Sequence, residues 1–122
     1  MSSIHKEALR LQAKGQASYR KKNYTEAIGE FTKALQLRNV PYTVQIGILD
    51  NRAAAREKIG GTASLELALQ DARMMTQLSK TQAAGYLRAG KVFQLLDRDE
   101  SALAIYAYGI KQVKPDSPQL EV

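Results

Sequence analysis

The sequence of 122 residues is 44% hydrophobic and 25% charged, which suits one globular domain with a buried core. It contains no cysteine and a single histidine, so disulfide scaffolds, cysteine-ligated zinc sites and thiol nucleophiles are excluded. Most of the formal net charge of +6 belongs to residues 1–22, where six Lys or Arg side chains stand against one Glu. No apolar run approaches the ~18 residues of a membrane span, and no signal-peptide core begins the chain. We therefore expect a nuclear or cytoplasmic protein that does not enter membranes.

Hydrophobic and small residues recur at helical spacing along the chain, and no segment alternates as a strand does. The pattern predicts six helices, at about residues 3–22, 24–37, 41–59, 64–78, 81–96 and 99–113. Three helix starts are predicted from capping-box pairs, namely Asn23 with Glu26, Ser79 with Gln82, and Asp97 with Glu100. Pro41 is expected at the first position of the third helix, and the Gly60-Gly61 pair is expected to end that helix.

The first predicted helix carries a basic ridge, because Lys6, Arg10 and Lys14 recur every four residues. We interpret the basic ridge as a solvated outer face. The alternative is an electrostatic handle for nucleic acid or for an acidic partner. Apart from Tyr19, aromatic side chains that could stack on bases are missing from this helix. We therefore do not expect a nucleic-acid partner.

Small residues occur in pairs at a constant separation, since Gly15 and Ala27 are twelve residues apart and so are Gly90 and Ala102. Antiparallel helices approach closely only where the facing residues are small, so each pair predicts a helix hairpin. The corresponding alanines of the middle unit, Ala53 and Ala68, are fifteen residues apart. We expect the three extra residues in the turn of that unit, near residues 60–64. Large side chains are expected to fill the seams between helices, namely Phe31, Tyr86, Phe93 and Tyr106.

The segment Tyr86-x-x-Ala89-Gly90-x-x-Phe93, followed by Ala102-x-x-x-Tyr106, resembles the tetratricopeptide repeat (TPR) in residue type and spacing. The resemblance implies an all-α fold of three stacked helix-turn-helix repeats that form a right-handed superhelical array. The repeats would cover residues 3–37, 41–78 and 81–114, and residues 116–122 would begin a truncated C-terminal cap. Residues 1–122 are therefore interpreted as a single domain, cut from a larger protein.

In such arrays the first helix of each pair lines a concave groove that can hold a segment of another protein. The repeat register predicts nine residues of this partner-binding groove: Gln12, Gln16, Tyr19, Arg20, Asn51, Ala54, Lys58, Arg88 and Lys91. The set is rich in amides and cations, which hydrogen-bond a peptide backbone and pair with carboxylates. We therefore expect the partner to be a protein that contributes an acidic segment, either extended or helical.

The register also resembles the carboxylate-clamp TPR domains of co-chaperones, which bind the acidic C-terminal tails of heat-shock chaperones. Those domains use Lys and then Asn on the first helix, Asn on the third, and Lys and Arg on the fifth. This chain has Gln12, Gln16, Asn51, Ala84 and Arg88 at the corresponding positions. Two of the five match and both lysines are missing, so clamp function is an alternative and not the favoured interpretation.

Two further segments, Gly85–Val92 and Ala104–Lys111, resemble the N-terminal TPR domain of fungal F-box/TPR/leucine-rich-repeat proteins. Those proteins are substrate receptors of SCF ubiquitin ligases. The resemblance, which covers residues 51–114, implies a domain that docks nuclear partner proteins associated with DNA replication.

Residues that could carry catalysis are sparse. His5 stands alone near the N-terminus, and Asp50 and Glu57 are two helical turns apart, about 10 Å, too far to share a proton. The acidic cluster Asp97, Asp99 and Glu100 is better explained by helix capping than by metal binding. We therefore expect no enzymatic activity, no cofactor, no metal site and no small-molecule substrate.

Overall fold

A computed structural model describes residues 2–113 of the chain, and within this range it contains six helices and no strand. The helices are α1 (Ser3–Arg20), α2 (Tyr24–Leu35), α3 (Tyr42–Ile59), α4 (Gly61–Leu78), α5 (Ala84–Leu95) and α6 (Asp99–Gln112). The all-α prediction and the number of predicted helices are confirmed. The expected cap at residues 116–122 lies outside the described residues.

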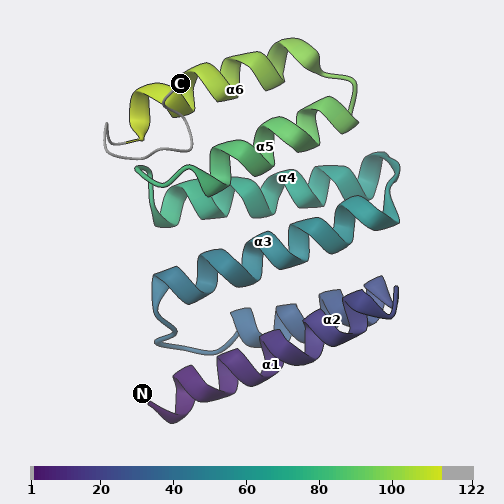
Figure 1. Ribbon diagram of the computed structural model, residues 1–122, viewed down its shortest axis with the longest axis vertical. Coiled ribbons are helices and arrows are strands. Elements are labelled where there is room, and N and C mark those ends of the chain that lie inside the picture. The colour runs from purple at the N-terminus through teal and green to yellow at the C-terminus, as the bar shows by residue number, and fades with distance from the viewer. Residues whose placement is uncertain (1, 114–122) are drawn as a thin grey trace.

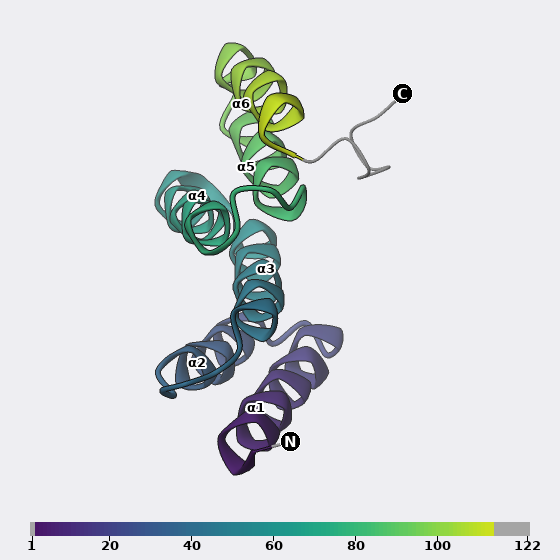
Figure 2. The same cartoon turned by 90° about the vertical axis from the view of Figure 1, so that its left-hand side faces the viewer.

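The helices form three hairpins that stack on one another along the long axis of the molecule (Figure 1). α1, α3 and α5 run in one direction, and α2, α4 and α6 run in the opposite direction. In the view turned by 90°, α2 and α4 lie on one side of the stack, whereas α1, α3 and α5 follow one another on the other side (Figure 2). Because α3 contacts both α1 and α5, the first helices of the three hairpins form one continuous layer.

The turn of the middle hairpin is the shortest in the described chain. Only Gly60 separates α3 from α4, and both Gly60 and Gly61 have left-handed backbone angles, with φ of 74° and 79°. Glycine adopts this conformation at little steric cost, so the chain reverses direction within one residue. The prediction that Gly60-Gly61 ends the third helix is confirmed. The prediction of three extra residues in this turn is wrong, because they lengthen the helices instead and α4 begins at Gly61.

The predicted capping boxes are not formed. Asn23 precedes α2, but its side chain makes no capping hydrogen bond. Ser79 is extended and ends α4, and α5 begins only at Ala84. Asp97 has a φ of 58°, and its amide donates to the carbonyl of Gln94, so it closes the end of α5 instead of starting α6. The local sequence pattern was therefore overridden by the turns that join the helices.

The sequence predicted Pro41 at the first helical position of α3. In the structure Pro41 is the N-cap residue and α3 begins one residue later, at Tyr42. A side-chain cap that was not predicted is formed at α1, where the backbone amide of His5 donates to Ser2 Oγ at 3.1 Å. This bond satisfies one of the free amides that every helix N-terminus exposes.

Close packing within the hairpins follows the predicted small residues. A β-carbon on Gly15 would overlap the ring of Phe31, which is completely buried, and one on Gly90 would overlap the ring of Tyr106. Ala27 is also completely buried. The glycines therefore make room for aromatic side chains of the second helix of their hairpin, as the repeat pattern predicted.

A buried ion cluster joins α3 to α4. Asp71 is fully buried, and its carboxylate accepts hydrogen bonds from Arg52 Nη2 at 2.6 Å and from Arg56 Nη1 at 2.9 Å. Burial is the largest influence on Arg56, and it lowers the pKa of that guanidinium. Arg52 also donates to the hydroxyl of Thr32 on α2. The cluster therefore ties α2, α3 and α4 together.

Candidate functional site

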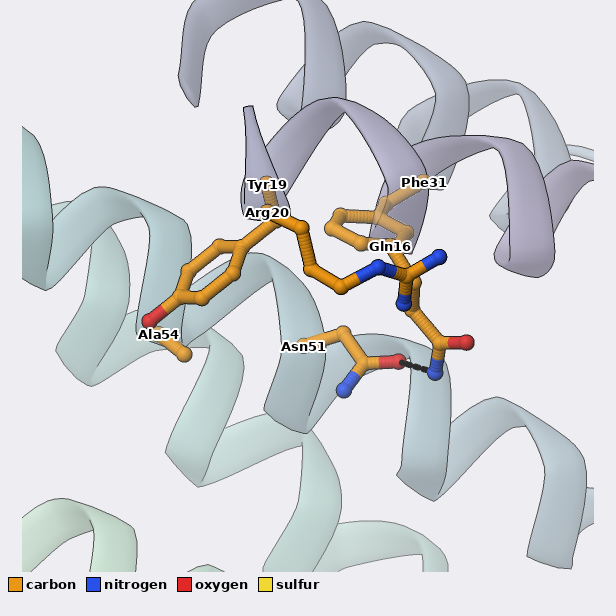
Figure 3. A pocket seen from close by; sticks show the side chains of 6 residues that line it. All are labelled: Gln16, Tyr19, Arg20, Phe31, Asn51 and Ala54. Carbon is orange, nitrogen blue, oxygen red and sulfur yellow. Dashed lines mark hydrogen bonds between the residues drawn. The ribbon is translucent and has the colours of Figure 1, made fainter. Parts of the chain in front are cut away.

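A pocket of about 220 Å³ is lined by residues of α1 and α3 and by one residue of α2. We call it the Tyr19 pocket. Its lining residues are Gln16, Tyr19, Arg20, Phe31, Asn51 and Ala54 (Figure 3). Five of these six belong to the predicted groove set, so the structure brings together residues that are 31 to 38 positions apart in the sequence. Its volume is below the roughly 300–1,000 Å³ of typical small-molecule sites, which suits one or two side chains of a peptide.

Amide side chains organise one wall of the Tyr19 pocket. Asn51 Oδ1 accepts hydrogen bonds from Gln12 Nε2 at 2.9 Å and from Gln16 Nε2 at 3.0 Å, and the second of these is drawn in Figure 3. A β-carbon on Gly47 would lie 3.4 Å from Gln12 Nε2, so the missing side chain leaves room for this glutamine against α3. The two hydrogen bonds join α1 to α3 and occupy the amide oxygen of Asn51. Its two N–H donors make no hydrogen bond to the described part of the chain.

A second pocket lies between α3 and α5, and its lining residues are Asp50, Ala84, Leu87, Arg88 and Lys91. We call it the Arg88 pocket. The guanidinium of Arg88 donates from Nε to Asp50 Oδ1 at 2.7 Å and from Nη1 to Glu57 Oε2. Lys91 Nζ lies 3.3 Å from Glu57 Oε1. Two cations therefore meet two carboxylates across the interface between the second and third hairpins.

The pKa of Arg88 reflects this pairing. Its burial opposes the charged form, but the hydrogen bonds and charges of Asp50 and Glu57 outweigh the burial and raise the pKa of the guanidinium above its ordinary value. Arg88 is thus held as a permanent cation by internal carboxylates. Both cations of the Arg88 pocket are therefore already paired with carboxylates of α3.

The remaining predicted residues lie at the edges of this layer. Lys58 is exposed near the C-terminal end of α3, one helical turn beyond Ala54. On α1, Arg10 makes a two-bond ion pair with Glu7, and this pair lowers the pKa of the Glu7 carboxyl. Lys14 approaches Glu30 at 3.8 Å, so two of the three charges of the basic ridge, at Arg10 and Lys14, have carboxylate partners within the chain. Lys6 is exposed.

Residues 2–113 show neither a metal-binding cluster nor a membrane-spanning helix. In this part of the chain no group of three or more His, Asp or Glu side chains is arranged to hold a metal ion. None of the helices described above combines the length and apolarity needed to cross a membrane.

Several side chains that shape this region were not predicted from the sequence. Phe31 was assigned to a packing seam, yet its ring also lines the Tyr19 pocket, and Leu87 of the Arg88 pocket was not singled out. Asp71 could have been noticed, because it lies beside Ala72 on the apolar face of α4 and its partners Arg52 and Arg56 are four residues apart on α3. A carboxylate at such a position requires a cation nearby.

Comparisons with known proteins were consistent with this architecture. The chain matches no sequence model of a protein family. It is 46% identical over 65 residues to Protein DIA2 of Eremothecium gossypii, a match that covers 53% of this chain and 9% of the relative. It is 32% identical over 108 residues to the F-box/TPR repeat protein pof3 of Schizosaccharomyces pombe, covering 88% of this chain and 18% of the relative. The chain thus spans less than a fifth of the length of these curated relatives.

Solved structures give the fold independently. The first TPR of Spaghetti (RPAP3), bound to the HSP90 peptide SRMEEVD, superposes with a TM-score of 0.74 at 24% sequence identity. The match covers 95% of this chain and 88% of that one. The six helices described above therefore form TPR repeats.

Proposed function

We propose that this chain, a TPR domain by fold and similar in sequence to fungal F-box/TPR proteins, docks a segment of a partner protein in its concave groove. The observation that carries the proposal is the Tyr19 pocket, where side chains from α1 and α3 surround a cavity of side-chain size with amides and a cation at its rim. A groove of this composition suits a peptide, because amides bond backbone groups and apolar surface receives a side chain.

The docking face can be tested with the natural partner in a pull-down. The groove variant combines Tyr19→Ala with Asn51→Ala, and the control combines Lys6→Ala with Arg10→Ala on the basic ridge. We expect the groove variant to lose the partner and the ridge variant to retain it at ~0.3 M salt, where exposed charges are screened. Loss in the ridge variant alone would place the docking face on the outer side of α1.

We further propose that the domain recruits substrates or partners for an F-box receptor of an SCF ubiquitin ligase in the nucleus, with a role near DNA replication. The sequence match to pof3 over most of this chain supports this reading. The test uses the complete reading frame that contains these residues. Purification from cells is expected to recover the ligase core subunits, and deletion of residues 2–113 is expected to abolish substrate ubiquitination but not assembly of the core. Ubiquitination that survives this deletion would contradict the proposed role.

A chaperone-tail adaptor is the second candidate, favoured by the structural match to a TPR domain bound to SRMEEVD. Against it, Gln12, Gln16 and Ala84 replace clamp residues, and Arg88 is already paired with Asp50 and Glu57. We therefore expect the peptide SRMEEVD to bind more weakly than a dissociation constant of ~10 μM, about −7 kcal/mol. Titration by calorimetry measures this constant directly, and a value below ~10 μM would favour the adaptor.

A further inference from the structure

The two ends of the concave layer differ in their free charge. Around the Arg88 pocket, Asp50 and Glu57 neutralise Arg88 and Lys91, and Glu57 has only 7% of its side chain exposed. A partner carboxylate placed there would compete with two internal carboxylates. A partner carboxylate that drew Arg88 away would also take from the mostly buried Glu57 one of its two cations, which costs stability. This end of the groove is therefore closed to acidic ligands.

The other end of the layer keeps its cations available. Arg20 lines the Tyr19 pocket, and neither it nor Lys58 pairs with a carboxylate of residues 2–113. Both side chains are exposed, and both lie at the C-terminal ends of helices that run in the same direction. A carboxylate near Arg20 would gain a charge-assisted hydrogen bond without displacing an internal partner.

The Tyr19 pocket itself is suited to an apolar side chain. The rings of Tyr19 and Phe31 and the methyl group of Ala54 supply apolar lining, and the guanidinium of Arg20 and the amides of Gln16 and Asn51 supply polar lining (Figure 3). Since Asn51 Oδ1 is occupied by the two glutamines, the amide N–H groups are what Asn51 offers to a ligand. These donors suit a backbone carbonyl beside the inserted side chain.

We propose that the groove recognises an internal segment of its partner, in which an apolar side chain enters the Tyr19 pocket and a neighbouring Asp or Glu pairs with Arg20. A free C-terminal carboxylate is not required for this recognition, because a side-chain carboxylate can pair with Arg20. The inference rests on the proposed docking function and names the partner chemistry of the same groove. It restricts acid recognition to Arg20, whereas the sequence predicted a groove whose cations included both Arg20 and Arg88.

The experiment begins with selection from random peptides of about twelve residues, displayed on phage with their C-terminus fused to the coat protein. Enriched peptides are expected to carry Leu, Ile, Met or Phe within two positions of Asp or Glu. The best peptide is then synthesised with both termini blocked, and its affinity is measured by fluorescence polarisation. Replacing its apolar residue by Ala, or its acidic residue by the matching amide, should weaken binding about tenfold or more, because each removes an anchoring contact.

Matched variants of the domain locate the two contacts. Arg20→Gln and Ala54→Leu should each weaken binding about tenfold, by removing the cation and by filling the pocket. Lys111→Gln and Ala104→Leu, both at exposed positions of α6, are the controls and should stay within about twofold. Lys91→Gln probes the Arg88 pocket, where Lys91 is already paired with Glu57. The amide form of the peptide should bind wild type and Arg20→Gln equally, which a purely structural role of Arg20 would not produce.

Three results would overturn the inference. Peptides that lose affinity with Lys91→Gln but not with Arg20→Gln would leave groove docking intact and refute the acid contact at Arg20. Binding insensitive to both Ala54→Leu and Arg20→Gln would place the peptide outside the Tyr19 pocket. Failure to enrich any peptide would count against this inference and against the proposed docking function together, whereas partner capture in the pull-down above would spare the docking function.

Discussion

The packing of α1 against α2 can be tested with two glycines of the same hairpin that face opposite environments. A β-carbon on Gly15 would overlap the ring of Phe31, whereas one on Gly29 would meet nothing within 4 Å. Both glycines lie within helices, so alanine gains about 0.5–1 kcal/mol of helix propensity at either site. At Gly15 the overlap with a completely buried ring adds an overpacking cost of about 1–3 kcal/mol. The propensity term cancels between the variants, and Gly29→Ala should exceed Gly15→Ala in stability by about 1–3 kcal/mol.

Urea unfolding followed by circular dichroism measures this difference. For a slope of about 1–3 kcal/mol/M, a gap of about 2 kcal/mol separates the two midpoints by roughly 1 M. Gly29→Ala is expected to unfold at higher urea than wild type and Gly15→Ala at lower urea. The cost at Gly15 should shrink when Phe31→Leu removes the ring, since contacting residues are not additive. Equal midpoints for the two alanine variants would show that the predicted repeat register is wrong.

Two further predictions concern buried polar groups. Asp71→Asn leaves two mostly buried guanidinium groups without their carboxylate and should lower the free energy of unfolding in urea by about 3–5 kcal/mol. The control Glu66→Gln, in the exposed pair with Arg98, should lower it by less than about 1 kcal/mol. Equal losses would contradict the role assigned to the cluster. Burial raises the pKa of Tyr86, whose hydroxyl donates to the backbone carbonyl of Lys80 at 2.7 Å. The neutral phenol therefore stabilises the fold below the unfolded pKa of about 10. This contribution is lost as the pH rises through the higher pKa of the folded protein. Tyr86→Phe should therefore lower stability at neutral pH by about 0.5–1.5 kcal/mol and flatten the fall above about pH 10, and parallel alkaline profiles of the two proteins would refute the assignment.

Local sequence patterns were a good guide to the helices and a poor guide to their ends. Six helices follow from apolar residues at helical spacing, because that spacing is set within each helix. The ends depended on the turns. Ser79 and Asp97 have the residue types of helix caps, but the structure uses them to end α4 and to close the turn after α5. Sequence alone cannot distinguish these uses, since a short polar side chain suits both a cap and a turn.

The repeat register placed the groove residues on the correct helices because it depends on spacing within each hairpin. Gln16 and Asn51 both lie on the layer formed by the first helices, and the structure joins them by a hydrogen bond. The repeat register does not predict which side chains of different hairpins contact one another. Within the first hairpin, where the register does apply, the ring of Phe31 occupies the space that Gly15 leaves and also lines the Tyr19 pocket.

The charge of the groove was decided by tertiary structure alone. From the sequence, Arg88 and Lys91 were cations free to choose a partner, and Asp50 and Glu57 were acidic residues on another helix. Arg88 lies 38 residues from Asp50 and 31 from Glu57, and only the stacking of α5 on α3 brings the guanidinium within bonding distance of both. Residue spacing determined which helices carry charge and which face each residue takes, because these are properties of one helix. Which charges cancel depends on distances between helices, and these follow from the packing of side chains across the stack.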